Sequence, residues 1–298
     1  MEVINRPDYT EKVKKLFGKG FIIALTGQRR VGKSFIMRQV IKELSQDSAA
    51  HVIYIDKDNE EFSFVQSHEE LTKYVKSNLL SNKRNYLFVD EIQNIKEFEV
   101  SLRSFHTNDE CEMVITGSNA KMLSSELSTY LSGRCVEYHI QSLDYREFLT
   151  FHRLSDNNQS LHNYLKYGGL PQLHRIGLEE TELVDDYLKS VYHTIVLKDV
   201  IEREEIRNVP LLKNLIRFVG DNVGKVFSAS SIVKYLKSQQ VDSSTRVILN
   251  YLEYLCNAYI INRVNRYDIH GKRLFELNDK FYFEDIGIRN SLVASGRS

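Results

Sequence analysis

Hydrophobic residues form two kinds of pattern in the first 140 positions, short continuous runs and helical repeats. The segments that read as strands are residues 21–25, 51–56, 86–89, 113–116 and 135–140, of which the last also contains Glu137 and His139. Short apolar runs bounded by polar residues are typical of strands buried on both faces of a parallel sheet. Between them, stretches such as residues 35–41 have apolar side chains at helical spacing, which predicts helices covering the sheet. We therefore expect an α/β fold with five parallel strands and flanking helices.

The pattern beyond residue 208 is different. Helical spacing of apolar residues predicts three helices, at residues 211–219, 232–236 and 242–255. Two short runs, 261–267 and 273–277, then flank the polar segment 268–272, which is the signature of a β-hairpin. Three helices followed by a hairpin predict a winged helix.

The first apolar run leads into a motif that indicates a specific chemistry. Its residues are Gly27, Gln28, Arg29, Arg30, Val31, Gly32, Lys33 and Ser34. They fit G-x-x-x-x-G-K-[ST], the phosphate-binding P-loop, between a strand and a helix. Glycines let backbone N–H groups face a polyphosphate, and the helix adds its positive end. We expect this loop and the adjoining Phe35 to bind ATP, with Lys33 on the β- and γ-phosphates and Ser34 on Mg²⁺.

The third apolar run, residues 86–89, ends in Asp90 and Glu91. A carboxylate pair in this position suits a P-loop ATPase, because the strand faces the γ-phosphate. Asp90 would hold Mg²⁺ through water, and Glu91 would orient or deprotonate the attacking water. Asp and Glu also end strands as helix caps, but the upstream P-loop favours the catalytic interpretation.

The fourth run ends in a small polar cluster, Thr116 to Asn119. At the carboxyl edge of a parallel sheet, such residues lie near the γ-phosphate and its water. Asn119 is the first candidate for a residue that senses the phosphate, followed by Thr116 and Ser118. A helix cap is the alternative role for Asn119.

Five strands, with an additional one between the phosphate loop and Asp90-Glu91, resemble those of AAA+ ATPases. In that class an arginine finger stands at the end of the helix before the fifth strand, where Arg134 stands here. The resemblance implies that Arg134 completes a neighbour's active site and that the protein forms homo-oligomers. An arginine at a helix end can also simply extend along the surface into solvent, and this alternative stays open.

Four further stretches narrow the resemblance to one group of bacterial and archaeal AAA+ ATPases. They are residues 142–149, 164–171, 191–200 and 280–290. Members of that group carry an uncharacterised C-terminal domain related to PD-(D/E)XK nucleases. The resemblance also implies that Gly169 and Pro171 contact the nucleotide from a helical lid, whereas spacing alone indicates only a helix stop there.

The resemblance implies four parts: an AAA+ core at 1–140, a helical lid at 141–208, a winged helix at 209–277, and a truncated C-terminal domain beginning at 278–298. No carboxylate cluster with a following lysine remains after Lys280, so we expect no nuclease activity. Apolar residues in the segment 6–17 recur at helical spacing, which predicts a helix. This helix either only packs against the rest of the protein or also contacts a nucleotide base.

Composition limits the partners. Lys and Arg together number 40, as do Asp and Glu, so the formal net charge is zero. The charge of the whole protein therefore does not attract polyanions such as nucleic acids. In the third winged-helix segment Arg246, next to Thr245, is the only cation; Lys234 and Lys237 lie in the second. DNA and protein both remain possible partners, with protein docking favoured.

Three scattered cysteines without C-x-x-C spacing argue against disulfides and zinc. No H-E-x-x-H or G-x-S-x-G pattern occurs, and no apolar run has membrane-spanning length. We expect a cytoplasmic protein that hydrolyses ATP with Mg²⁺ to drive or time movement of the lid and winged helix. The alternative is a nucleotide-gated switch for DNA or protein that binds ATP or ADP with little turnover.

Overall fold

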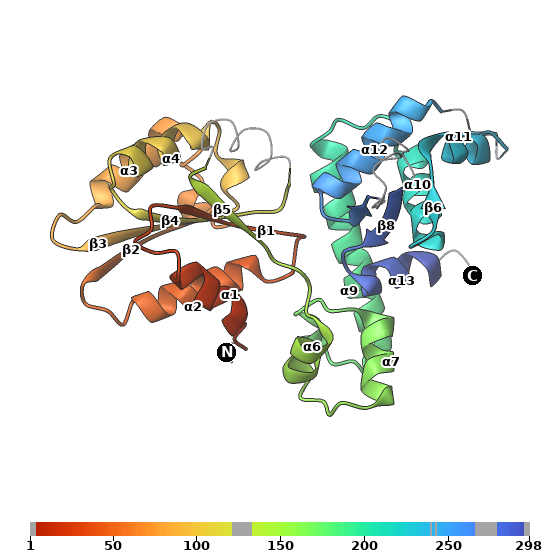
Figure 1. Ribbon diagram of the computed structural model, residues 1–298, viewed down its shortest axis with the longest axis horizontal. Helices are drawn as coiled ribbons and strands as arrows, with labels where there is room; N and C mark the ends of the chain where they lie inside the picture. Colours follow the sequence, from red (N-terminus) through yellow and green to blue (C-terminus); the bar gives the residue numbers. More distant parts are fainter. Residues whose placement is uncertain (1–3, 121–132, 239, 242, 266–278, 295–298) are drawn as a thin grey trace, which may run out of the picture. The chain divides into compact units, whose positions relative to one another are not determined.

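The computed structural model describes residues 4–120, 133–238, 240–241, 243–265 and 279–294. The chain forms two compact units (Figure 1). The first comprises residues 1–27 and 31–141, and the second comprises residues 28–30 and 142–298. The two units are described separately.

A five-stranded sheet with the order β2-β3-β4-β1-β5 forms the centre of the first unit, and all its pairings are parallel. Its strands are β1 (Ile22–Thr26), β2 (Ala50–Asp56), β3 (Arg84–Asp90), β4 (Glu112–Gly117) and β5 (Cys135–His139). Every residue of β1 is buried, as are the last five of β3 and of β4. Burial on both faces explains the continuous apolar runs, and the five predicted strands are confirmed.

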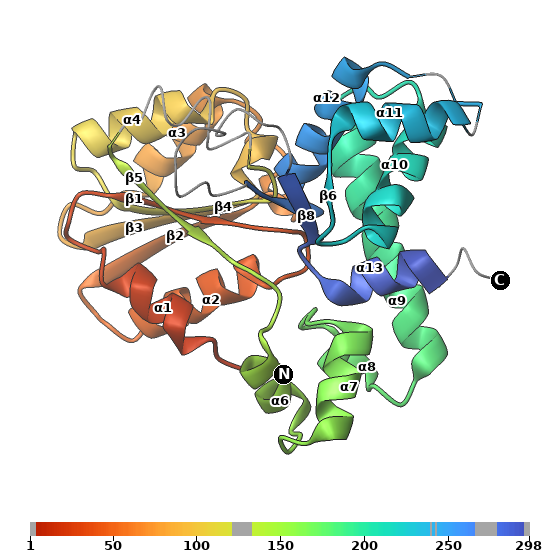
Figure 2. The same cartoon turned by 45° about the vertical axis from the view of Figure 1, so that its right-hand side comes forward.

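Helices cover both faces of this sheet (Figures 1 and 2). They are α1 (Pro7–Lys14), α2 (Lys33–Leu44), α3 (His68–Asn78) and α4 (Phe98–Thr107), with 3-10 turns η1 (Glu60–Phe62) and η2 (Ile92–Asn94). Figure 1 shows α1 and α2 on one face and α3 and α4 on the other. Because strand side chains alternate between faces, Ile22 and Ala24 share one core with Leu71 of α3 and Phe105 of α4.

The strand order determines which loops meet. β4 lies between β1 and β3, with Ala24 opposite Ile115 and Val89 also opposite Ile115. Because the strands are parallel, the residues that follow β1, β3 and β4 all emerge at the same edge of the sheet. Residues that precede a strand, such as Arg134 before β5, lie at the opposite edge.

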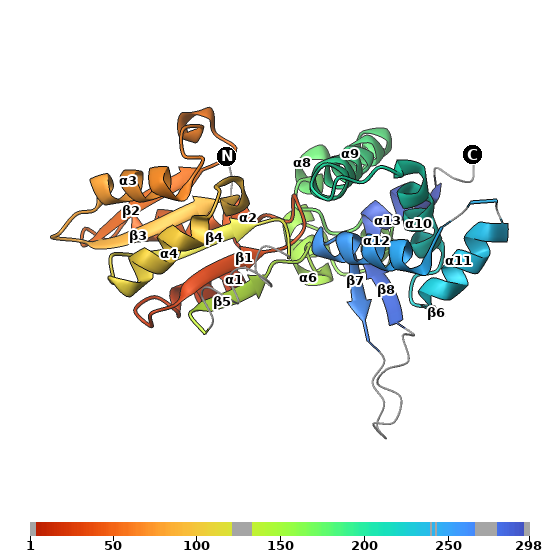
Figure 3. The same cartoon turned by 90° about the horizontal axis from the view of Figure 1, so that it is seen from above.

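The second unit is mainly helical and contains a small antiparallel sheet (Figure 3). Its helices are α6 (Tyr145–His152), α7 (Asn158–Tyr167), α8 (Leu173–Ile176), α9 (Thr181–Thr194), α10 (Val209–Asp221), α11 (Ala229–Ser238), α12 (Thr245–Asn257) and α13 (Ile286–Ala294). A π-helical stretch, η4 (Ile195–Glu202), continues α9. The sheet has the order β6-β8-β7, with β6 (Val226–Phe227), β7 (Ile261–Val264) and β8 (Asp279–Phe283).

The last described segment, residues 279–294, packs within this second unit. β8 pairs with β6 and β7, and Phe281 stacks on Phe227 with ring centroids 5.2 Å apart. Helix α13 contacts α7, α9 and α10. The expected turn at 268–272 and the expected strand at 273–277 lie outside the described residues, as does most of the segment before the fifth strand where a helix is expected.

Two glycine-containing segments far apart in sequence meet at Asp285, whose carboxylate is buried. Its Oδ2 accepts from the N–H of Gly169 at 2.9 Å, and its Oδ1 accepts from the N–H of Ile288 at 3.0 Å. A Cβ on Gly287 would lie 1.9 Å from the carbonyl oxygen of Tyr167, so no side chain fits there. The end of α7 and the start of α13 therefore form one closely packed junction.

Candidate functional site

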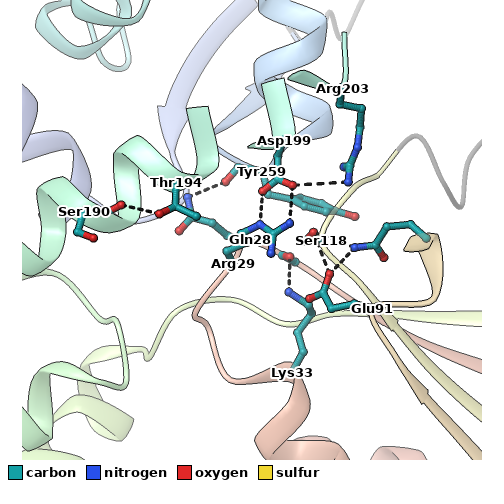
Figure 4. Close-up of polar contacts among 12 residues, drawn as sticks. Gln28, Arg29, Lys33, Glu91, Ser118, Ser190, Thr194, Asp199, Arg203 and Tyr259 are labelled. Carbon is teal, nitrogen blue, oxygen red and sulfur yellow. Dashed lines mark hydrogen bonds and ion pairs between the residues drawn. The ribbon is translucent and has the colours of Figure 1, made fainter. Parts of the chain in front are cut away.

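Part of the phosphate loop is shaped by glycine and closed by Lys33. Gly27 and Gly32 have φ values of 136° and 101°, which L side chains rarely adopt. A Cβ on Gly27 would also lie 2.2 Å from the carbonyl oxygen of Ile140. Lys33 is 4% exposed at the first position of α2, and its Nζ donates to the carbonyl of Gly27 at 2.9 Å (Figure 4).

One hydroxyl joins the carboxylate of Asp90 to the backbone of Glu91. Thr116, at the buried end of β4, donates its Oγ1–H to Asp90 Oδ1 and accepts the N–H of Glu91 at 2.9 Å. Glu91 has a φ of 53°, so the chain turns sharply immediately after β3. Asp90 and Glu91 are 3% and 7% exposed. The structure therefore brings together the end of β4 and the acidic pair, as the sequence predicts.

Two neutral donors hold the Glu91 carboxylate. Ser118 Oγ donates to Glu91 Oε2 at 3.2 Å, and Gln93 Nε2 donates to the same oxygen (Figure 4). Gln93 Nε2 also lies 3.3 Å from Ser118 Oγ. Gln93 is not predictable from the sequence, because a single glutamine two residues after an acidic pair forms no recognisable motif.

Burial raises the pKa of Asp90, and the nearby negative charges of Glu91 and Asp56 raise it further, whereas hydrogen bonds from the hydroxyls of Thr116 and Ser34 lower it. A hydroxyl and a carboxylate in direct contact offer the hard oxygen ligands that Mg²⁺ prefers. A divalent cation would also relieve the cost of ionising a buried carboxylate. Ser34 and Asp90 therefore fit a magnesium ion.

The remaining predicted residues of the first unit lie in different surroundings. Asn119 is 3% exposed and directly follows Ser118. Phe35 is 39% exposed on α2, with the guanidinium of Arg38 over its ring. Arg134 is exposed, and its carbonyl accepts the N–H of Ile22 at the amino end of β1. Arg134 and Lys33 therefore lie at opposite edges of the sheet.

Gln28, Arg29 and Arg30 belong to the second unit by their contacts. Gln28 Nε2 donates to the carbonyl of Tyr259 at 2.9 Å, and Arg29 forms an ion pair with Asp199 (Figure 4). Arg30 has a φ of 71°, in the left-handed region.

Gly169 and Pro171 also lie in the second unit. The N–H of Gly169 is bound by Asp285, and its carbonyl accepts the N–H of Leu143 at 2.7 Å. Pro171 is half-buried just before α8. Both backbone groups of Gly169 are therefore engaged inside the second unit.

Arg6 is another residue that the sequence analysis did not single out. It is 4% exposed, and its Nη1 donates to the carbonyls of Val31 and Gln141, each at 3.1 Å. It thereby links the segment before α1 to the phosphate loop. Its position before Pro7 at a helix start was the one visible signal.

Comparison with known proteins identifies the class. Residues 19–149 match a family described as an AAA domain, and residues 158–297 match a domain of unknown function, DUF8612. The fold resembles that of the Walker-type ATPase PABY2304 of Pyrococcus abyssi, with a TM-score of 0.67 and 16% identity, over 97% of this chain and 96% of that one. The chain is an AAA-domain protein with a P-loop ATPase fold, and the predicted α/β fold class is confirmed.

The protein belongs to the same family as an uncharacterized protein of Haemophilus influenzae, which is 31% identical over 98% of this chain and 74% of its own length. The uncharacterized protein MJ1544 of Methanocaldococcus jannaschii is 29% identical over 85% of this chain, which spans 58% of that relative. The C-terminal match to DUF8612 gives no support for a nuclease-related domain. Within the described ranges, no helix has the length and apolar character needed to cross a membrane.

Proposed function

We propose that the protein binds ATP with Mg²⁺ at the first unit and hydrolyses it to ADP and phosphate. The observation that carries this proposal is the hydroxyl of Thr116, which joins Asp90 to the backbone of Glu91. The strand order brings this pair to the sheet edge from which the phosphate loop emerges. This is the arrangement that attack by water on a bound γ-phosphate needs.

Each residue has a distinct role in this proposal. Lys33 and the loop amides bind the phosphates, Ser34 and Asp90 would hold Mg²⁺, and the ion would neutralise charge that develops on the phosphate oxygens. Glu91 accepts a proton as the water oxygen bonds to the γ-phosphorus and the bond to the ADP oxygen breaks. Asn119 senses the γ-phosphate, supported by its burial next to Ser118.

The second unit would respond to the nucleotide. Its order α10, β6, α11, α12, β7, β8 and its antiparallel sheet support a winged helix. Thr245 and Arg246 are exposed at the start of α12, and Lys234 and Lys237 are exposed on α11. We propose that this module moves with the nucleotide state and binds protein or DNA, and that Gly169 and Pro171 act in a helical lid.

A nucleotide-gated switch with little turnover is the second candidate. The two hydrogen bonds to Glu91 Oε2 favour it, because Ser118 and Gln93 already occupy an oxygen that would otherwise accept from the attacking water. In that case the bound nucleotide, rather than its hydrolysis, sets the state of the protein.

Glu91→Gln tests the two candidates. We expect phosphate release to fall by roughly 10² or more, because the proton acceptor is lost, whereas ATP affinity changes little. Phosphate release and ATP binding are measured with and without duplex DNA. Glu61→Gln, at an exposed carboxylate of η1, is the matched control. Wild-type phosphate release that does not depend on Glu91 would contradict the hydrolytic proposal.

A further inference from the structure

Asp199 is a buried carboxylate whose main partner lies within the phosphate-loop sequence. Its side chain is 0% exposed. Arg29 Nε donates to Asp199 Oδ2 at 2.6 Å, and Arg29 Nη2 donates to Asp199 Oδ1 at 2.9 Å (Figure 4). Arg203 Nη2 lies 3.6 Å from Oδ1. All three residues belong to the second unit, so the contacts are internal to it.

Arg29 and Asp199 form a bidentate ion pair, in which two nitrogens of the guanidinium each donate to one carboxylate oxygen. Two parallel N–H···O bonds fix both the distance and the plane of the guanidinium. A carboxylate taken out of water needs such a partner, because the loss of its hydration is unfavourable. The fully buried Asp199 therefore holds Arg29 in one orientation, and Arg29 is only 21% exposed in its side chain.

The neighbouring loop residues are fixed as well. Gln28 is fully buried and donates its side-chain amide to the carbonyl of Tyr259, and Arg30 takes a left-handed backbone conformation. Successive N–H groups bind a polyphosphate only when the backbone has the right shape. Side-chain anchors at residues 28 and 29 restrict that shape before any ligand arrives.

The position of Asp199 depends on the π-helical stretch η4. Here α9 passes into a wider helix, and at this transition Thr194 Oγ1 donates to the carbonyl of Ser190 at 2.9 Å (Figure 4). Such stretches often lie at functional sites, because the altered register redirects side chains. Asp199 and Arg203 are four residues apart, so their side chains lie on the same face of the helix and come within 3.6 Å of each other.

We infer that Asp199 is a positioning residue for nucleotide binding: it fixes Arg29, and through the chain it fixes the backbone of residues 28–30 in the form that accepts a polyphosphate. This inference rests on the proposed function. Arg29 then acts as an anchor and not as a phosphate ligand. If Arg29 instead had to leave Asp199 to reach the phosphate, Asp199 would compete with ATP, and its removal would strengthen binding.

The sign of the change in affinity therefore tests the inference. We expect Asp199→Asn and Arg29→Ala each to raise the Kd for a fluorescent ATP analogue with Mg²⁺ by about tenfold. The double variant should show the same increase as either single variant, because both substitutions remove one interaction. Arg29→Lys keeps the charge but not the two-point geometry, so it should fold and give a smaller increase in Kd.

The matched control is a second arginine–aspartate pair in the same unit. Arg263 Nε donates to Asp279 Oδ2 at 2.6 Å, away from the loop sequence. Asp279→Asn should leave the Kd within about twofold of wild type. A Kd for Asp199→Asn that is unchanged or lower, with Lys33-dependent binding retained, would overturn the inference alone. Binding in wild type that Lys33→Ala does not weaken would overturn the proposed function itself.

Discussion

At the residue scale, the site depends on how Thr116 is used. Its single hydroxyl donates to Asp90 and accepts from the backbone of Glu91. A buried hydroxyl with both roles filled has one orientation, so the Asp90 carboxylate and the backbone of Glu91 are held in a defined relation. Removing that hydroxyl would take away the acceptor of the buried Glu91 N–H and one of the donors to the buried Asp90 carboxylate.

Asp90 should oppose the stability of the ligand-free protein. The pKa of Asp90 is higher in the folded state than in the unfolded state. The protonated group therefore favours folding below the unfolded pKa, and this contribution is lost as pH rises through the folded pKa. At neutral pH, Asp90→Asn should therefore raise the melting temperature by about 3 °C without ligand. The same variant should lose the additional stabilisation that ATP with Mg²⁺ gives to wild type.

Thermal unfolding with and without ATP and Mg²⁺ checks both parts of this prediction. Asp58→Asn, at an exposed carboxylate after β2, is the control and should change neither value. A ligand-free Asp90→Asn protein that melts below wild type would show that the hydrogen bonds to the carboxylate outweigh its burial.

The sequence predicts residues whose role follows from a local motif. Lys33, Ser34, Asp90 and Glu91 are identifiable because strand, loop and helix follow one another in a fixed spacing. Asp199 is not, because its partner lies 170 positions away. Gln93 and Arg6 act through contacts with residues that only the folded chain brings together.

At the element scale, continuous apolar runs predict the strands well, since burial on both faces leaves little choice of residue. The π-helical stretch η4 was not predicted. Its apolar residues have nearly helical spacing, and the extra residue per turn leaves no distinct pattern. The helix stop at Gly168 is visible in the sequence, and α7 ends at Tyr167.

Helix α6 should make the protein sensitive to acid. Its last residue is His152, whose Nε2 is buried without a hydrogen-bond partner in the described structure. Burial is the main cause that lowers the pKa of His152 to about 4; the charge of His174 contributes in the same direction, and that of Glu179 opposes it. Because the folded pKa lies below the unfolded one, stability should decrease as pH falls from about 6.5 toward 4.

His152→Gln should reduce this decrease, because glutamine does not titrate. Melting temperatures between about pH 4.5 and 7.5 test the prediction. His162→Gln, on the exposed side of α7, is the control and should keep the wild-type pH dependence. An equal slope in wild type and His152→Gln would exclude His152 as the origin of acid sensitivity.

At the scale of the whole molecule, the location of Arg134 bears on assembly. Cys135 pairs with Ile22 at the amino end of β1, whereas Lys33 follows the carboxyl end. At ~3.3 Å per residue, the two ends of β1 are about 13 Å apart. Arg134 is therefore too distant for its own Lys33 site, and any catalytic role requires a second copy of the chain.

A mixing experiment tests this role. Arg134→Ala should lower the ATPase rate by roughly 10³, and Glu91→Gln should lower it by roughly 10² or more. When they are combined, a site with Glu91 from one chain and Arg134 from the other is complete, so part of the activity should return. Arg103→Ala, at an exposed arginine of α4, should be fully active alone. Mixtures with no more activity than their components would contradict catalysis in trans.

The junction at Asp285 has a consequence for biosynthesis. The amino end of the chain leaves the ribosome first. Residues 167–169 therefore emerge more than a hundred positions before Asp285, whose carboxylate accepts the N–H of Gly169. Helix α7 can form early, but its last turn becomes buried only after α13 has been synthesised and packs against it. All five strands of the first unit have been synthesised once β5 has emerged, so this unit can fold while the second is still being translated. The second unit can complete its packing only after α13 has emerged.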